Sequence, residues 1–196
     1  MKGKNQKMKF VYLIFRCWLS SLVILLLLSA FAHADQNDSR LVELFRSLKS
    51  TENLSTASVF ETKIWHIWME HNDPEVERTM FQGLEALKLK LFEKAFGHFS
   101  LLIKLAPDYA EAWNKRATVL YLMGRFKESE SDVMRTLELE PRHFGALSGQ
   151  GLIRIALEDW SGAIYFLESA LKINPHMHGV FINLKYARQK YKESIT

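Results

Sequence analysis

The amino-acid sequence predicts an all-α protein, a solenoid of helix-turn-helix pairs. The main observation is a period of 34 residues, since three of the four prolines, Pro107, Pro141 and Pro175, follow one another at that step. Four further columns keep the same register, namely Phe92, Phe126 and Trp160; Gly83, Ala117 and Gly151; Ala95, Ser129 and Ala163; and Phe99, Val133 and Leu167. Agreement of five columns over three units indicates an internal repeat, and repeats of this length form solenoids.

These columns have a physical interpretation as a pair of packed helices. A small residue at 83, 117 and 151 lets the first helix approach the second closely, and the aromatic residue at 92, 126 and 160 fills the angle between them. Proline ends the unit because it supplies no amide to the helix. A unit of this kind resembles the tetratricopeptide repeat, and the resemblance implies three units, at residues 76–109, 110–143 and 144–177.

Two columns depart from the family pattern in a polar direction. The family has leucine before the small residue and an aromatic residue later in the first helix. This chain has instead Gln82, Arg116 and Gln150 at the first place, and Ala86, Leu120 and Arg154 at the second. The polar replacements mark either a contact surface or drift within short repeats, and the sequence leaves both open.

Residues 35–75 are expected to form an N-terminal helix pair. Leucine and phenylalanine have helical spacing between positions 41 and 48, and a second, strongly apolar helix is expected from position 58, with Ser58 and Glu61 as a candidate capping box. We expect this pair to stack on the first repeat as a degenerate repeat.

The remaining helix boundaries are marked by local signals. Asp73 followed by Pro74 has the residue types of a helix start, with aspartate as the cap and proline in the first turn. Residues 178–196 carry a few apolar residues among many charged ones, and we expect them to form the C-terminal capping helix that repeat arrays need.

Residues 1–34 have the layout of a secretory signal peptide. Five basic residues precede an uncharged run from Cys17 to Ala32, and small residues stand at Ala32 and Ala34. We expect cleavage between Ala34 and Asp35. The run is shorter than the ~20 residues of a membrane-spanning helix, which favours cleavage over the alternative, an uncleaved membrane anchor.

Removal of this leader changes the charge of the chain. The whole chain has 26 Lys and Arg against 22 Asp and Glu, and the leader holds five of the cations and none of the acids, which leaves 21 against 22. The mature chain therefore lacks the net basic character that is typical of nucleic-acid binding, and we expect no nucleic-acid partner. The only cysteine, Cys17, lies in the leader, so the core is expected to hold without disulfides.

The sequence offers no recognisable site for catalysis, for a metal ion or for a cofactor. The stretch GALSGQG at residues 145–151 lacks the Lys-Ser/Thr of a phosphate loop and falls inside a repeat helix. His66 and His71 are five residues apart and do not share a helix face, while His176 and His178 fall in a turn between units. We therefore predict that the protein is not an enzyme, and a role as an enzyme accessory subunit is the less favoured alternative.

The family resemblance implies a concave groove lined by the first helix of each pair. Register assigns to it Glu77, Met80, Leu84, Leu87, Glu111, Asn114, Lys115, Thr118, Tyr121, Leu122, Ser148, Leu152 and Ile155. This mixture of apolar and small polar groups suits an extended peptide or a helix of a partner protein, and the alternative is an array that only spaces domains. The clamp with which chaperone-binding relatives grip a C-terminal carboxylate is not supported, because Glu77 and Glu111 stand where lysine is needed.

Within the groove, the triplet Asn114-Lys115-Arg116 divides into three roles. Asn114 faces the groove, and Lys115 lies at its edge, four residues after Glu111, where a favourable ion pair can form. Arg116 takes the place that the family gives to a packing leucine. One anion site therefore does not account for the three residues.

These patterns lead to an expectation about function. The chain resembles the small periplasmic repeat proteins of Gram-negative bacteria, and we expect a non-catalytic scaffold or adaptor that presents its groove to a protein partner in the bacterial cell envelope. A membrane-anchored assembly factor is the alternative if the leader is kept, and membrane contact is expected only through that leader.

Overall fold

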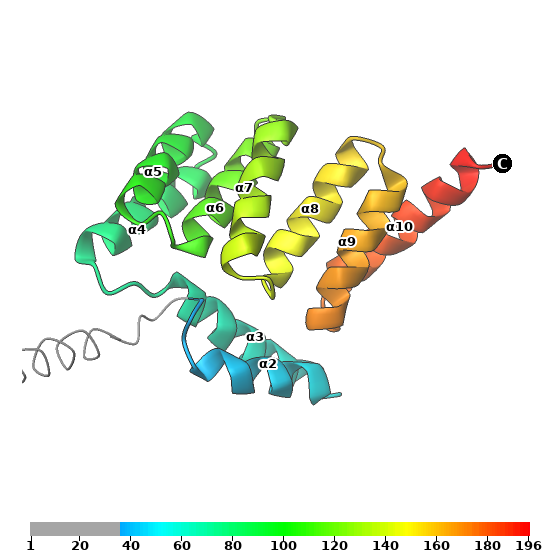
Figure 1. Ribbon diagram of the computed structural model, residues 1–196, viewed down its shortest axis with the longest axis horizontal. Coiled ribbons are helices and arrows are strands. Elements are labelled where there is room, and N and C mark those ends of the chain that lie inside the picture. The colour runs from blue at the N-terminus through cyan, green and yellow to red at the C-terminus, as the bar shows by residue number, and fades with distance from the viewer. Residues whose placement is uncertain (1–35) are drawn as a thin grey trace, which may run out of the picture. The chain divides into compact units, whose positions relative to one another are not determined.

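The computed structural model describes residues 36–196, and these form nine helices and no strand (Figure 1). Their bounds are α2 Arg40–Ser50, α3 Leu54–Met69, α4 Pro74–Lys88, α5 Phe92–Leu105, α6 Ala110–Leu122, α7 Phe126–Leu139, α8 Phe144–Ala156, α9 Trp160–Ile173 and α10 His178–Ser194. The predicted all-α class is confirmed. The expected signal peptide and its cleavage site lie outside the described residues.

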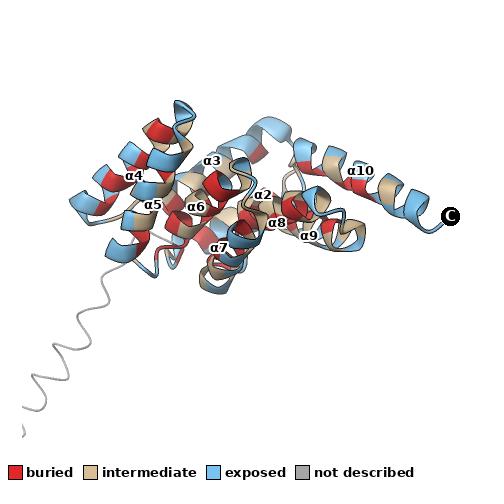
Figure 2. Ribbon diagram, turned by 90° about the horizontal axis from the view of Figure 1, so that it is seen from above, coloured by how far each residue is buried: buried red, intermediate tan, exposed pale blue. Residues whose placement is uncertain are grey.

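Three helix pairs follow one another along the solenoid. The pairs are α4 with α5, α6 with α7, and α8 with α9, and α10 packs on α9 at the C-terminal end (Figure 1). Buried residues line the facing sides of the paired helices, and exposed residues line their outer sides (Figure 2). Each pair therefore shares its apolar surface with its neighbours, as a solenoid requires.

The small-residue column works as the sequence predicts. A Cβ atom on Gly83 would lie 2.5 Å from the Phe99 ring, and one on Gly151 would lie 2.6 Å from Leu167. Both distances are far below van der Waals contact, so only glycine lets these first helices cross the second helix at this depth. The column of small residues and the column of large apolar residues are the two sides of one contact.

Helix starts follow local capping rules, with one correction to the sequence-based expectation. The Asp73 side chain accepts a hydrogen bond from the Glu75 amide at 2.8 Å, with proline in the first turn, as predicted. The predicted capping box at Ser58 is wrong. The second helix begins earlier because the Asn53 side chain caps it, accepting from the Thr56 amide at 3.0 Å, so that Ser58 lies inside α3.

The N-terminal pair does not stack on the first repeat, contrary to the expectation. Its helices α2 and α3 lie along one edge of the solenoid, against the starts of α6 and α8 and the turn before α10 (Figure 1). The Asn174 amide donates to Glu61 at 3.0 Å, and a His176 ring nitrogen lies 3.1 Å from the Leu48 carbonyl oxygen. The reason is the apolar character of α3, whose tryptophans pack on Phe144 rather than on α4.

Two features of the described part complete the fold. On α4, the side chain of Phe81 is 65% exposed. None of the helices within residues 36–196 has both the length and the apolar character required to cross a bilayer.

Candidate functional site

A buried carboxylate lies at the start of the predicted groove. Glu111 is 1% exposed, and one of its oxygens is 2.6 Å from the Lys115 ammonium nitrogen, so the ion pair predicted from the sequence is present. The other oxygen accepts a hydrogen bond from the Asn114 amide at 2.9 Å and lies 2.8 Å from His143 Nε2. Three partners thus compensate a charge that would be unstable if buried alone.

His143 connects this carboxylate to the next repeat. Its Nδ1 accepts a hydrogen bond from the Ala146 amide at 3.0 Å and so caps α8, which leaves the proton of the neutral ring on Nε2, where it donates to Glu111. The imidazole is fully buried and stacks on Trp68, with ring centroids 4.1 Å apart and planes 8° from parallel. One side chain therefore joins α3, α6 and α8.

The environment of Glu111 strongly favours its charged form. Burial raises the pKa of this carboxyl, but the charge of Lys115 and the hydrogen bond from His143 outweigh burial and lower the pKa to about 2. The carboxylate is therefore ionised throughout the neutral range and acts as a structural anion.

Helix α3 covers this end of the groove. The Lys115 ammonium nitrogen lies 5.2 Å from the centre of the Trp65 ring, and a Cβ on Gly145 would be 2.6 Å from the same ring. Glu111 is thereby closed off from a partner, which corrects its assignment as a contact residue. Asn114, 7% exposed, is also mostly buried because its amide serves Glu111, and Met80, 4% exposed, packs in the core with α5.

Beyond the covered end, a slot of about 90 Å³ opens between α6 and α8, with α7 as its floor. It is lined by Asn114, Ala117, Thr118, Tyr121, Ser129, Val133, Gly145, Gly149, Leu152 and Ile153. Four of the predicted groove residues, Asn114, Thr118, Tyr121 and Leu152, therefore come together here. Register alone did not reveal the floor, since Ser129 and Val133 belong to packing columns of the repeat.

The other predicted groove residues do not line this slot. Glu77, Leu84 and Leu87 lie on α4, in the first repeat, and Lys115 is engaged with Glu111 beside the slot. Leu122 is 48% exposed at the end of α6, and Ser148 and Ile155 are partly exposed on α8. The predicted set thus divides into a compact group on α6 and α8 and a separate group on α4.

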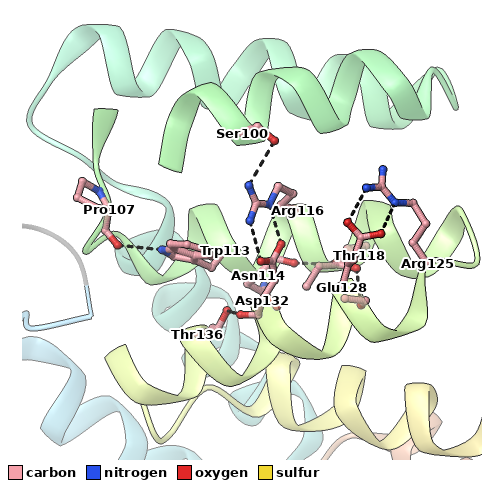
Figure 3. Close-up of polar contacts among 12 residues, drawn as sticks. Ser100, Pro107, Trp113, Asn114, Arg116, Thr118, Arg125, Glu128, Asp132 and Thr136 are labelled. Carbon is pink, nitrogen blue, oxygen red and sulfur yellow. Dashed lines mark hydrogen bonds and ion pairs between the residues drawn. The ribbon is translucent and has the colours of Figure 1, made fainter. Parts of the chain in front are cut away.

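The unusual Arg116 stabilises the stack rather than forming an anion site. Its guanidinium donates twice to Asp132 on α7, at 2.7 and 2.8 Å, and reaches Ser100 on α5 at 3.4 Å (Figure 3). It also lies 5.1 Å from the centre of the Trp113 ring. A bidentate ion pair within the second repeat therefore replaces the packing leucine, and the contact with Ser100 links that repeat to the first.

The next unit has a similar polar seam. The Gln150 amide donates to Glu130 at 2.8 Å, and Arg154 pairs with the same carboxylate and with Asp159. Arg116, Gln150 and Arg154 are thus each paired with a carboxylate inside the chain, whereas Gln82 is exposed on α4. The sequence left open a contact surface or drift, and for these three residues the structure shows a different role, polar pairing within the stack.

The histidines are engaged singly rather than as a cluster. His66 lies 2.6 Å from Glu70, while His143 and His176 have the partners described above. Within residues 36–196, no three His, Cys, Asp or Glu side chains converge in a way that could hold a metal ion.

Comparison with known proteins identifies solved structures that share this arrangement of helices. No protein-family model matches the chain. The TPR2B domain of yeast Sti1, in its pHsp70 complex, superposes with a TM-score of 0.58 at 21% identity, covering 60% of this chain and 99% of that domain. The first TPR domain of Spaghetti, bound to an HSP90 peptide, gives a TM-score of 0.59 at 19% identity, with 60% and 94% covered.

The chain has the tetratricopeptide-repeat fold. A TPR repeat-containing protein of Rhizobium etli is 38% identical over 114 residues, and its name supports the same repeat family. That alignment covers 58% of this chain and 56% of the Rhizobium protein, so the chain spans about half the length of that relative. None of these names indicates an enzyme family.

The charge of Glu111 predicts a specific pH dependence of stability. Because its folded-state pKa of about 2 lies below the ordinary 4.5, Glu111 contributes stability that is complete above pH 4.5 and is lost as the pH falls towards 2. We expect Glu111→Gln to be less stable at neutral pH and to lose less unfolding free energy over that range, measured by urea unfolding at a series of pH values. The exposed Glu52→Gln is the control, and equal pH dependence in Glu111→Gln and the natural protein would contradict the assignment.

Proposed function

We propose that the chain is a non-catalytic protein-interaction scaffold, which binds a segment of a partner protein in the groove between α6 and α8. The observation that carries this proposal is the slot itself, a recess of about 90 Å³ on two successive first helices of the repeat domain. A concave, mostly apolar recess with a few polar groups is the usual form of a binding site.

Two solved repeat domains support a peptide as the bound group. The Spaghetti domain carries an HSP90 peptide, and the Sti1 domain is in a complex with pHsp70. Both share the fold of this chain at low identity, so the support concerns the binding of a peptide by this fold and not the identity of the partner. A scaffold that only spaces domains is the competing function, and it gives no reason for an open slot.

We further propose that the protein works in a bacterial cell envelope after removal of its leader. What supports this is the leader layout, in which basic residues, an uncharged run and small residues precede Asp35. N-terminal sequencing of the protein from its native host tests the proposal. A first residue of Asp35 is expected, whereas a retained leader would favour the membrane-anchored assembly factor.

The groove proposal predicts that a charge in the slot weakens binding. We expect Leu152→Asp to weaken peptides selected on the full-length protein by about tenfold or more, because the apolar slot leaves a carboxylate uncompensated. The measurement is panning of a random peptide library, followed by titration of the enriched peptides. Leu101→Asp, at an exposed leucine of α5, is the matched control, and circular dichroism verifies the fold of both variants.

Two outcomes would contradict the groove proposal. If the enriched peptides bind Leu152→Asp and Leu101→Asp equally well, the contact surface lies elsewhere on the molecule. If the library yields no binder at all, the spacer function is favoured.

A further inference from the structure

The groove of this chain is closed at one end by its own N-terminal helices. Glu111, on the first turn of α6, and His143, at the start of α8, are 1% and 0% exposed. Trp65 and Trp68 of α3 cover them, through the contact with Gly145 and the stack on His143. A partner peptide that ran along the full length of α6 and α8 would collide with α3.

The closure is held from several sides and is therefore a fixed part of the site. The Gln36 side chain donates to the Asp108 carbonyl at 2.6 Å and accepts from the Ala110 amide at 3.3 Å, which ties the segment before α2 to the start of α6. Before the start of α8, the Arg142 guanidinium lies 4.7 Å from the centre of the Phe45 ring of α2. These contacts join α2 and the segment before it to the starts of α6 and α8.

The slot begins directly after this closure and is short. Asn114 and Gly145 form its first lining residues, beside the covered positions. A Cβ on Gly149 would meet no atom within 4 Å, so the slot is open at this position because glycine has no side chain. A slot of about 90 Å³ has room for roughly three water molecules, at the ~30 Å³ that each occupies in the liquid, which corresponds to one side chain and not to a length of peptide.

The surface inside the slot is apolar although several polar residues line it. The Thr118 hydroxyl donates to the Asn114 carbonyl at 3.0 Å, and the Ser129 hydroxyl donates to the Ala117 carbonyl at 2.7 Å. The Asn114 amide is held by Glu111. Because these three donors are already hydrogen-bonded within the protein, the aliphatic groups of the lining form the main surface that a ligand would contact.

The two cations next to the slot are likewise engaged. Lys115 pairs with Glu111, and Arg116 pairs with Asp132. All ten residues that line the slot, as the described part of the chain defines it, are uncharged. A peptide carboxylate placed here would lose its hydration without gaining a charged partner, which is unfavourable.

We propose that α3 is a built-in stop, and that the slot takes one aliphatic side chain from an internal segment of a partner protein, not a free C-terminus. This inference rests on the proposed function and makes it narrower. The stop prevents a chain end from threading along the groove, and the uncharged slot selects for an aliphatic side chain presented from the open end.

Two peptide libraries test this inference on the full-length protein. In one, random segments are flanked on both sides by a carrier protein, and in the other they end in a free carboxylate. We expect the flanked library to yield binders that share one aliphatic position. Amidation of a terminal carboxylate is expected to leave the affinity unchanged.

A pair of glycine substitutions tests the slot itself. Gly149→Leu fills the open space and is expected to reduce affinity by about tenfold to a hundredfold, the range for losing one buried aliphatic side chain. Gly97→Leu, at a glycine of α5 that is also free of neighbours within 4 Å, is the matched control and should bind normally. Melting curves verify both folds, and Gly149→Ala with Gly97→Ala replaces the pair if the leucine variant fails to fold.

The outcomes separate the inference from the function on which it rests. Binders found only among free C-termini, or binders that tolerate Gly149→Leu as well as Gly97→Leu, would overturn the stop and the slot while leaving a peptide-binding groove. Failure of both libraries to yield any binder would overturn the proposed function as well.

Discussion

The buried carboxylate of Glu111 is the interaction on which the arrangement of this molecule depends. It pairs with Lys115 of its own helix and accepts a hydrogen bond from His143, which precedes α8. The imidazole in turn stacks on the Trp68 ring of α3. Removing one of these partners would leave the buried carboxylate less well compensated, which is destabilising. A single charged group thus fixes three helices that are distant in sequence.

This constraint explains why the N-terminal helices lie along one edge of the solenoid. A pair stacked on α4 would not have covered Glu111 and His143, and the whole groove would have stayed open. The tryptophans of α3 instead pack against Phe144 and His143, so one end of the groove becomes part of the core and the other remains a short slot. The same contacts that stabilise the fold therefore determine which part of the groove a partner can reach.

Much of the fold could be predicted from the sequence because the residues of each packing contact recur at equivalent positions in the three repeats. The columns at Gly83 and Phe99, and at Gly151 and Leu167, are the two sides of one close approach, and their period exposes them. The ion pair of Glu111 with Lys115 was also predictable, since it lies within one helix. Contacts that occur once and join distant segments left no such signal, and the stack of Trp68 on His143 is of that kind.

The candidate site shows the same division. Register assigned Thr118, Tyr121 and Leu152 to the groove, and the structure brings all three together around the slot; their contact with a partner stays a prediction. The register did not predict that α3 would cover Glu111, and it did not show that Gly149 opens the slot. Both depend on side chains that are distant in sequence. Arg116 was recognised as an anomaly, but its pairing with Asp132 required the structure.

Native-state hydrogen exchange of the full-length protein tests whether the Glu111–His143 pair joins the N-terminal helices to the second and third repeats. We expect the most protected amides of α3 (Leu54–Met69) to open with the same free energy as those of α6 and α8, and Glu111→Gln to lower protection in α3 more than in α10. Rapid exchange throughout α3, while α6 and α8 stay protected, would contradict it.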